Sequence, residues 1–261
     1  MQKAKFTKHE KTMGDVVRSK YLLPLLQDAP GIVLDIGTGG TPKGDVNVDI
    51  NREWWNWYKG QHREGYEGMK GYFTKWGDQP IPNFVLADGT ALPFKEAVFS
   101  SVVGSDLLEH IENDTQALSE MRRVLKPGGR VILHTPNKDQ THIIQFRGKV
   151  NVCNAQGEKE TLTFGEQEEH VRPGYSSDEL RTKLKLAGFS EIAISATFNI
   201  VECLAWEWDR FIVFEAMCSG IDPRTATVFP IRLNNLVYIQ NQMRSFDPES
   251  YKNLAWLVVA K

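Results

Sequence analysis

The chain has 261 residues, of which 41% are hydrophobic and 25% are charged. That length and composition are typical of a globular protein that can bury a large core. The net charge of −2 and the isoelectric point near 6.3 exclude a general attraction to phosphate backbones or anionic membranes, so nucleic acid is an unlikely partner on charge alone.

An amphipathic helix is predicted first, over residues 15–28, and Pro24 is expected to kink or end it. Five short apolar runs follow, at residues 31–36, 46–50, 84–87, 100–104 and 130–135. Near-continuous runs of this kind, rich in Val, Ile and Leu, are typical of parallel strands covered on both faces. They therefore predict the strands of a parallel sheet.

Two further helices are predicted in the second half of the chain. One begins after a cap at Asn113 or Asp114 and is stopped by the Pro-Gly-Gly sequence at 127–129. The other lies within residues 175–189, where Ser176 and Glu179 form a capping box and Gly188 ends the helix. Strands follow at 190–197 and 254–261, and this alternation of strands and helices predicts an α/β fold.

Three segments lie outside this alternation, at residues 51–83, 138–175 and 198–250. In open α/β sheets, ligands bind beyond the carboxyl ends of the strands, and insertions there form lids or substrate walls. We therefore expect a single domain over residues 1–261, with these segments shaping the substrate site.

The sequence "VLDIGTGG" ends the first strand with Asp35 and continues into Gly37, Gly39 and Gly40. Glycines let the backbone turn sharply and approach a ligand closely. The dinucleotide pattern G-x-G-x-x-G fails, because Pro42 stands at its third glycine. Asp35 can anchor the loop or meet a positively charged group of a ligand.

Acidic residues also end the next two strands. Asp49 in "VNVDI" can accept hydrogen bonds from both hydroxyls of a ribose. Asp88 in "VLADGTALPF" can accept from an exocyclic amine such as that of adenine. Taken in order along the chain, these strand ends are a more specific signal than the glycine loop alone.

These motifs, with "EMRRVLKPGGRVILHTPN" and "YSSDELRTKLKLAGF", resemble the class I S-adenosylmethionine-dependent methyltransferases that act on small molecules. The resemblance covers roughly residues 30 to 195 and the last strand. It implies a Rossmann-like, seven-stranded, mostly parallel sheet with helices on both faces and a C-terminal antiparallel strand. It also implies a transferase that uses S-adenosylmethionine as cofactor.

The resemblance assigns cofactor contacts residue by residue. Gly37 and Gly39 would contact the methionine part, Asp49 the ribose, and Asp88 the adenine amine. The remaining cofactor-site residues are Asp35, Ile50 beside Asp49, Gly89 beside Asp88, and Ser105 on the methionine side.

One departure from the family is the first crossover, "GTGGTPKGD", which has room for at most one helical turn. A helix N-terminus that would help bind the carboxylate is therefore missing. Loop amides arranged as a small backbone nest are the expected replacement. Short loops of this type resemble a branch of the family linked to sugars.

Methyl transfer to a hydroxyl also needs a base near neutral pKa, and histidine is the natural candidate. His110 in "LLEHIEN" follows the fourth strand and either faces the acceptor or holds a loop. His170 in "EEHVRPGY" either enters the site from a lid or stays solvated. His134 is expected to be structural, and Asp106 and Glu109 are alternatives or electrostatic neighbours.

The aromatic residues Trp54, Trp57 and Tyr58 are candidates for core packing or for an aromatic wall against a sugar ring. The leading function is methylation of a small or sugar-like hydroxyl compound. The alternatives are a nucleic-acid methyltransferase, a nicotinamide oxidoreductase and a cofactor-binding scaffold without turnover.

Cys153, Cys203 and Cys218 show no metal-binding spacing, so no metal is expected. The N-terminus lacks the apolar core of a secretory signal, and no run approaches the ~18 apolar residues of a membrane span. We therefore expect a cytoplasmic protein, and the aromatic insertions are compatible with a homodimer.

Overall fold

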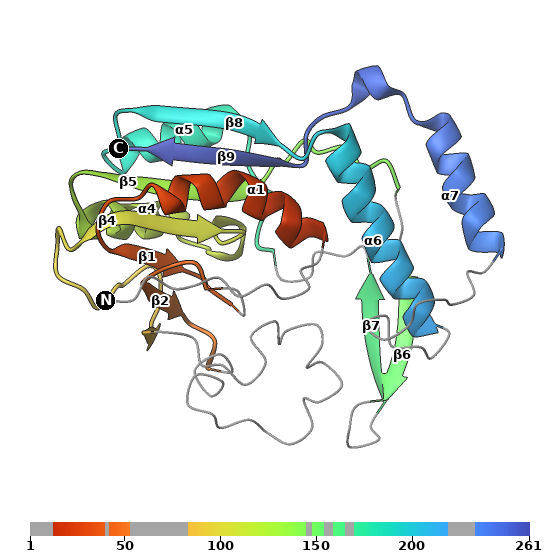
Figure 1. Cartoon of the computed structure of the whole chain (residues 1–261), viewed down its shortest axis with the longest axis horizontal. Helices are drawn as coiled ribbons and strands as arrows, with labels where there is room; N and C mark the ends of the chain where they lie inside the picture. Colours follow the sequence, from red (N-terminus) through yellow and green to blue (C-terminus); the bar gives the residue numbers. More distant parts are fainter. Residues whose placement is uncertain are drawn as a thin grey trace.

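A seven-stranded sheet forms the centre of the computed structural model (Figure 1), which describes residues 13–39, 42–52, 83–144, 148–153, 159–164, 170–218 and 233–261. The strand order is β3-β2-β1-β4-β5-β9-β8. The strands are β1 (Val33–Ile36), β2 (Val46–Asp49), β3 (Phe84–Leu86), β4 (Phe99–Ser105), β5 (Leu125–Pro136), β8 (Ile192–Thr197) and β9 (Ala255–Ala260).

Strand direction follows the prediction from the sequence. The pairs from β3 to β5 are all parallel, whereas β9 runs antiparallel to both of its neighbours, β5 and β8. The mostly parallel sheet with an antiparallel C-terminal strand is thus confirmed. Because β1 to β4 are parallel, their carboxyl ends lie together at one edge of the sheet.

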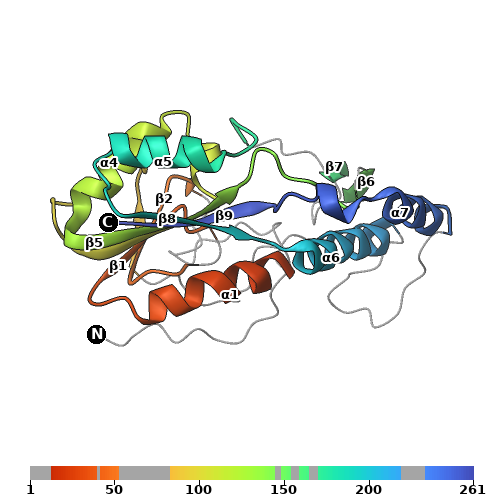
Figure 2. The same ribbon diagram turned by 90° about the horizontal axis from the view of Figure 1, so that it is seen from above.

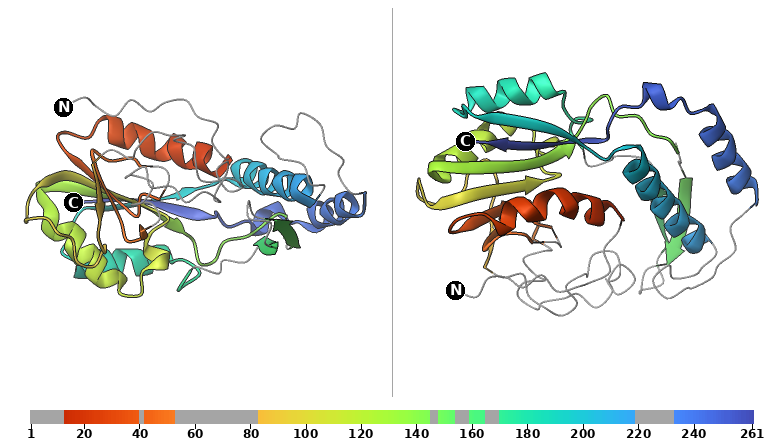
Figure 3. Two further views of the ribbon diagram at one scale, coloured as in Figure 1. Left: turned by 90° about the horizontal axis from the view of Figure 1, so that it is seen from below. Right: turned by 45° about the horizontal axis from the view of Figure 1, so that its top comes forward.

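Helices cover both faces of the sheet. Figure 2 shows α1 (Met13–Gln27) on one face and α4 (Asp114–Val124) and α5 (Ser177–Leu186) on the other, and Figure 3 shows the same layers from the opposite side. Neighbouring residues of β4 pack on opposite faces of the sheet. Val102 belongs to the core under α4, whereas Val103 belongs to the core under α1. Burial on both faces explains why these strands read as continuous apolar runs.

Two elements differ from their predicted bounds. The first helix continues past Pro24 to Gln27, with Leu22 and Leu26 on either side of the proline packed against the sheet. Strand β5 begins at Leu125 and runs through the Pro-Gly-Gly sequence, because Phe99 pairs with Leu125 while Ser101 pairs with Arg130. The register shift between those pairs accommodates the extra residues in β5.

The described helices and strands of the two later inserted segments, 138–175 and 198–250, lie beyond the carboxyl edge of the parallel strands (Figure 1). They are the hairpin β6 (Gly148–Cys153) and β7 (Lys159–Phe164), the helices α6 (Ile200–Cys218) and α7 (Leu233–Ser245), and the short 3-10 helix η3 (Pro248–Ser250). Trp54, Trp57 and Tyr58 lie outside the described residues. None of the helices in the described ranges is long and apolar enough to cross a membrane.

Candidate functional site

The glycine loop after β1 turns back onto β2 without a helix in its described part, residues 37–39 and 42–45. The Gly37 and Thr38 amides both donate to the Val48 carbonyl, at 2.8 and 3.2 Å. Gly37 and Gly39 have φ angles of +68° and +49°, a region that side chains disfavour. The turn itself therefore requires glycine at positions 37 and 39.

Buried side chains replace the missing helix. Asp35, fully buried at the centre of β1, accepts through Oδ2 from the Lys43 amide at 2.7 Å and the Thr38 hydroxyl at 3.0 Å. Asn47 of β2 exchanges hydrogen bonds with the backbone of Gly44, accepting from its N–H and donating to its C=O. These two side chains fix the ends of the crossover.

The predicted amide nest is not found among the loop residues that the structure describes. The amides of residues 37, 38, 39, 43 and 44 all donate to groups within the protein. The physical reason is that a crossover without helical hydrogen bonds must satisfy its own amides. Burial raises the pKa of Asp35, whose contacts hold the loop.

Carboxylates stand at the ends of β2 and β3, as predicted. Asp49 accepts from the Gly39 and Asn51 amides, each at 2.8 Å, and is 9% exposed. Asp88 is exposed and uses only Oδ1, which accepts from the Thr90 amide and hydroxyl. The Ala87 amide donates to the Asp49 carbonyl, so the two strand ends lie side by side.

The other predicted cofactor residues surround this edge. Ser105 ends β4 and is 9% exposed, whereas Ile50 is 67% exposed after β2. Gly89 is buried against Ile36, and a β-carbon there would come within 3.2 Å of that side chain. The acidic acceptors at adjacent strand ends and the tight glycine turn suit a nucleoside with hydroxyl and amine donors, so these residues fit S-adenosylmethionine.

The turn after β4 is held by a half-buried polar network. Asp106 has a φ of +51°, and its carboxylate contacts His134 Nδ1 at 2.9 Å and Arg18 at 3.1 Å. His134 Nε2 lies 3.1 Å from the Thr197 hydroxyl, so both ring nitrogens are engaged, as a structural histidine requires. Burial opposes ionisation of Asp106, but Arg18 and His134 outweigh it and lower the pKa of this carboxyl.

Next follows the 3-10 turn η2 (Leu108–His110), which carries a fully buried carboxyl group, that of Glu109. Glu109 Oε2 accepts from the Thr135 hydroxyl at 3.1 Å, and Oε1 has no hydrogen-bond partner among the described residues. Burial, and then the charge of Asp106, raise the pKa of Glu109 to about 8.

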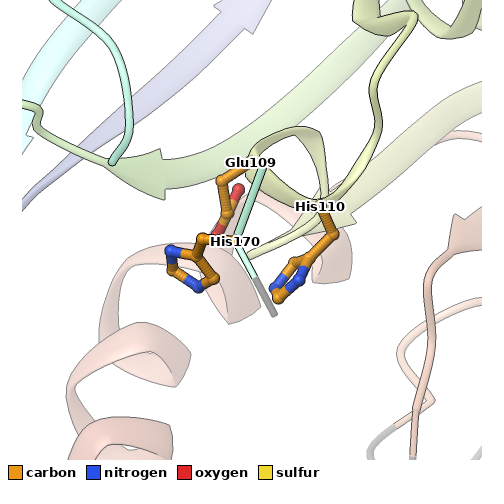
Figure 4. Close-up of side chains that lie close together, drawn as sticks. All are labelled: Glu109, His110 and His170. Atoms are coloured by element: carbon orange, nitrogen blue, oxygen red, sulfur yellow. The ribbon is translucent and has the colours of Figure 1, made fainter. Parts of the chain in front are cut away.

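The fold brings the two predicted catalytic histidines together. The rings of His110 and His170 meet edge to face, with centroids 4.5 Å apart. Figure 4 shows both rings beside the Glu109 carboxyl group, and one potential ligand atom from each of the three residues lies within 4.8 Å of the others. Residue spacing along the chain cannot show that residues 110 and 170 meet, because 60 positions separate them.

A clamp that the sequence did not reveal places His170 there. The Val171 amide donates to the Glu109 carbonyl at 2.9 Å. The Arg172 guanidinium donates to the Leu108, Ile111 and Glu112 carbonyls, at 2.7, 2.6 and 2.9 Å. The segment from His170 onward is therefore fastened to η2.

The histidine pair lies near the glycine loop. A β-carbon at Gly37 would come 2.5 Å from Leu107 Cδ1, and one at Gly89 would come 3.6 Å from Ile111 Cδ1. Residues on either side of η2 thus contact both the loop after β1 and the turn after β3. The His142 ring, in contrast, lies 2.8 Å from Glu207 of α6.

Comparison with known sequences agrees with this arrangement. Residues 63–133 match a family model described as a methyltransferase domain. A demethylmenaquinone methyltransferase from Streptomyces griseus is 46% identical over 54 residues, which are 21% of this chain and 24% of that protein. The ubiquinone/menaquinone biosynthesis C-methyltransferase UbiE of Haemophilus ducreyi is 30% identical over 122 residues, which are 42% of this chain and 45% of the relative. The chain thus matches less than half the length of these relatives.

Solved structures share the fold. A SAM-dependent methyltransferase from Archaeoglobus fulgidus superposes on this chain with a TM-score of 0.51 at 16% sequence identity. The superposition covers 96% of this chain and 94% of that one. Phosphoethanolamine N-methyltransferase 2 from Haemonchus contortus, solved with S-adenosyl-L-methionine, gives 0.51 at 15% identity, covering 93% of this chain and 52% of that one. At these identities the likeness establishes a common fold.

Proposed function

Because the chain belongs to the class I S-adenosylmethionine-dependent methyltransferases, we propose that it methylates a hydroxyl oxygen of a small molecule. S-adenosylmethionine is the cofactor of this family, and its sulfonium supplies an already activated methyl group. The observation that carries the proposal is the histidine pair on η2, whose flanking residues contact the loop after β1 and the turn after β3, beside the strand-end carboxylates.

Asp49 and Asp88 are the residues we assign to the nucleoside. Asp49 is held by two backbone amides, so its carboxylate is oriented before any ligand arrives. Asp88 keeps Oδ2 without a hydrogen bond among the described residues, which leaves an acceptor for an amine. Both groups that donate hydrogen bonds to Asp35 lie in the loop, so we assign Asp35 to support of the turn rather than to contact with the ligand.

His110 and His170 are the residues we assign to the acceptor. In the transfer, a C–O bond forms as the S–C bond breaks, the electron pair returns to sulfur, and the hydroxyl proton must leave. An imidazole near the acceptor can take that proton at neutral pH. Segments 51–83, 138–175 and 198–250 of a single domain would form the walls around the acceptor.

Relatives point to small molecules as acceptors, and one of them is named a C-methyltransferase. A carbon acceptor activated by its own neighbouring groups would not need the histidine pair. The hydroxyl is favoured here because two histidines from distant parts of the chain are fastened together at the site.

The cofactor assignment is tested by calorimetric titration with S-adenosylhomocysteine and, separately, NADH. We expect S-adenosylhomocysteine to bind and NADH not to bind. Asp49→Ala should weaken binding by at least about tenfold, because a charged hydrogen-bond acceptor to the ribose is lost. Asp49→Asn keeps an oxygen acceptor for only one of the two backbone amides, so it should weaken binding less than Asp49→Ala does. Asp28→Asn, an exposed position at the end of α1, is the control.

The competing functions have distinct outcomes. Binding of NADH alone would indicate an oxidoreductase. A salt-sensitive shift of RNA or DNA would favour a nucleic-acid methyltransferase. Cofactor binding with no methylated product across hydroxyl, amine and carbon acceptors would favour a scaffold without turnover.

A further inference from the structure

We propose that Glu109, His110 and His170 form a binding site for a divalent transition-metal ion. The three side chains come from η2 and from the segment after β7, and their potential ligand atoms lie within 4.8 Å of one another. Figure 4 shows the carboxyl group and the two imidazole rings side by side. The proposal therefore starts from a geometric cluster rather than from spacing in the sequence.

The donor set selects the class of ion. Two imidazoles and one carboxylate on one side of an ion leave other positions open, which is the arrangement of non-haem iron sites and suits Mn²⁺, Fe²⁺ or Zn²⁺. Mg²⁺ and Ca²⁺ prefer oxygen ligands alone. Donor atoms about 2.1 Å from an ion and on one side of it lie about 3.0 to 3.4 Å apart. The cluster, whose potential ligand atoms lie within 4.8 Å of one another, must therefore tighten when the ion binds, and the exposed His110 side chain can rotate to do so.

Glu109 gives an independent reason to place a cation here. Its side chain is fully buried, and Oε1 has no hydrogen-bond partner among the described residues. A buried carboxyl oxygen without a hydrogen-bond partner is costly in either protonation state, because it has lost its water without replacement. A metal ion between Glu109 and the histidines would supply the missing positive charge.

The protein holds the ligands in place from outside the cluster. The Val171 amide donates to the Glu109 carbonyl, which joins the residue after His170 directly to η2. Arg172 binds three carbonyls of the same turn. A site built on such fixed backbone loses less entropy when the ion binds, since fewer bonds must be ordered.

The role of the ion in catalysis rests on the proposed function. Through an open coordination position, the acceptor oxygen would bind the ion, which lowers the pKa of the hydroxyl. The proton would then pass to water, the S–C bond would break as the C–O bond to the acceptor forms, and the sulfonium would become a neutral thioether. With the ion bound, the histidines would serve as its ligands; without the ion, they serve as the bases assigned above.

The test is Mn²⁺ binding to the full chain, followed by electron paramagnetic resonance and calorimetry, with Zn²⁺ as competitor. We expect one Mn²⁺ per chain, displaced by Zn²⁺ and not by equimolar Mg²⁺. His110→Asn and His170→Asn should each weaken binding by more than about tenfold, since loss of even an outer-shell partner costs about 10- to 100-fold. Glu109→Gln should do the same, and His110→Asn is the variant safest for folding because His110 is exposed.

His142→Gln is the matched control, because His142 also contacts a carboxylate but lies outside the cluster. Absence of Mn²⁺ and Zn²⁺ binding by folded protein would overturn the proposal. Binding that all three ligand variants retain would also overturn it. S-adenosylhomocysteine titration of the same samples keeps the two proposals apart, because cofactor binding does not require these three side chains.

Discussion

At the scale of single residues, this molecule uses acidic and amide side chains for two separate tasks at one sheet edge. Asp35 of β1 and Asn47 of β2 flank the crossover and accept hydrogen bonds from its amides and from the Thr38 hydroxyl. Asp49 and Asp88 stand at the strand ends, where a ligand can reach them. Aspartate is structural in the middle of a strand and a ligand candidate at the strand end or just beyond it.

Gly44 offers a prediction about the short crossover. A β-carbon at this position would lie 2.5 Å from the Val46 carbonyl oxygen and 2.7 Å from the Asp35 amide nitrogen, both backbone atoms that cannot move aside. We expect Gly44→Ala to lower the free energy of unfolding by about 3 kcal/mol, at the upper end for overpacking. Urea denaturation measures this loss, and S-adenosylhomocysteine affinity should fall with it.

Gly128→Ala is the control for that change. Gly128 has a φ of +74° with no atom within 4 Å of the added carbon, so the substitution meets only backbone strain. Its expected cost is about 1 kcal/mol. Equal losses for the two variants would mean that the crossover can open to admit a side chain.

At the scale of elements, the sequence predicts the strands and caps well. The apolar runs become strands, Asn113 and Ser176 cap their helices, and the capping box with Glu179 is present. These features depend on neighbours in the chain, so a local pattern can reveal them. His110 and His170 could be named singly as candidates for the same reason.

The contacts between those elements could not be predicted from the sequence. The clamp of Arg172 joins residues far apart in the chain, and one arginine in "EEHVRPGY" looks like any solvated charge. The burial of Glu109 is equally hidden, because "LLEHIEN" reads as a polar turn. Local patterns carry no information about which distant segment covers a turn.

Arg172 is a positioning residue, and its replacement should change the affinity of the proposed site for Mn²⁺. Lysine retains the charge but lacks the fork that reaches three carbonyls. We expect Arg172→Lys to weaken Mn²⁺ binding by about tenfold, through displacement of His170. Arg122→Lys is the control, because Arg122 donates to the Gly188 carbonyl just after α5 and not to η2. It should leave the affinity for Mn²⁺ unchanged. Equal losses in both variants would mean that a general loosening, not His170, is responsible.

At the scale of the whole molecule, Asp114 joins the helical layer to the segment that carries the site. Its carboxylate accepts from the Tyr175 hydroxyl at 2.7 Å and from Lys183 of α5 at 2.8 Å, and Arg172 lies 3.3 Å away. One buried charge at the start of α4 therefore ties α5 and the clamp together on one face of the sheet.

This junction predicts how stability depends on pH. Burial raises the pKa of Asp114, but hydrogen bonds from Lys183 and Tyr175 and the charge of Arg172 outweigh burial and lower the pKa below 3.8. A carboxyl whose pKa is lower in the folded state stabilises the protein above the unfolded value of 3.8, and this contribution is lost as the pH falls further. Asp114→Asn should cost about 2 kcal/mol at neutral pH, because hydrogen bonds to a charged group are removed.

The measurement is urea denaturation of wild type and Asp114→Asn from about pH 7 to about pH 3. The difference in unfolding free energy should stay constant to about pH 5 and then shrink as the wild-type carboxyl becomes protonated. Asp178→Asn, an exposed change on α5, should follow the wild type throughout. If the difference in unfolding free energy instead stays constant down to the lowest pH, the asparagine variant has lost packing rather than a charge. In that case the charge of Asp114 does not hold α4, α5 and the histidine-bearing segment together.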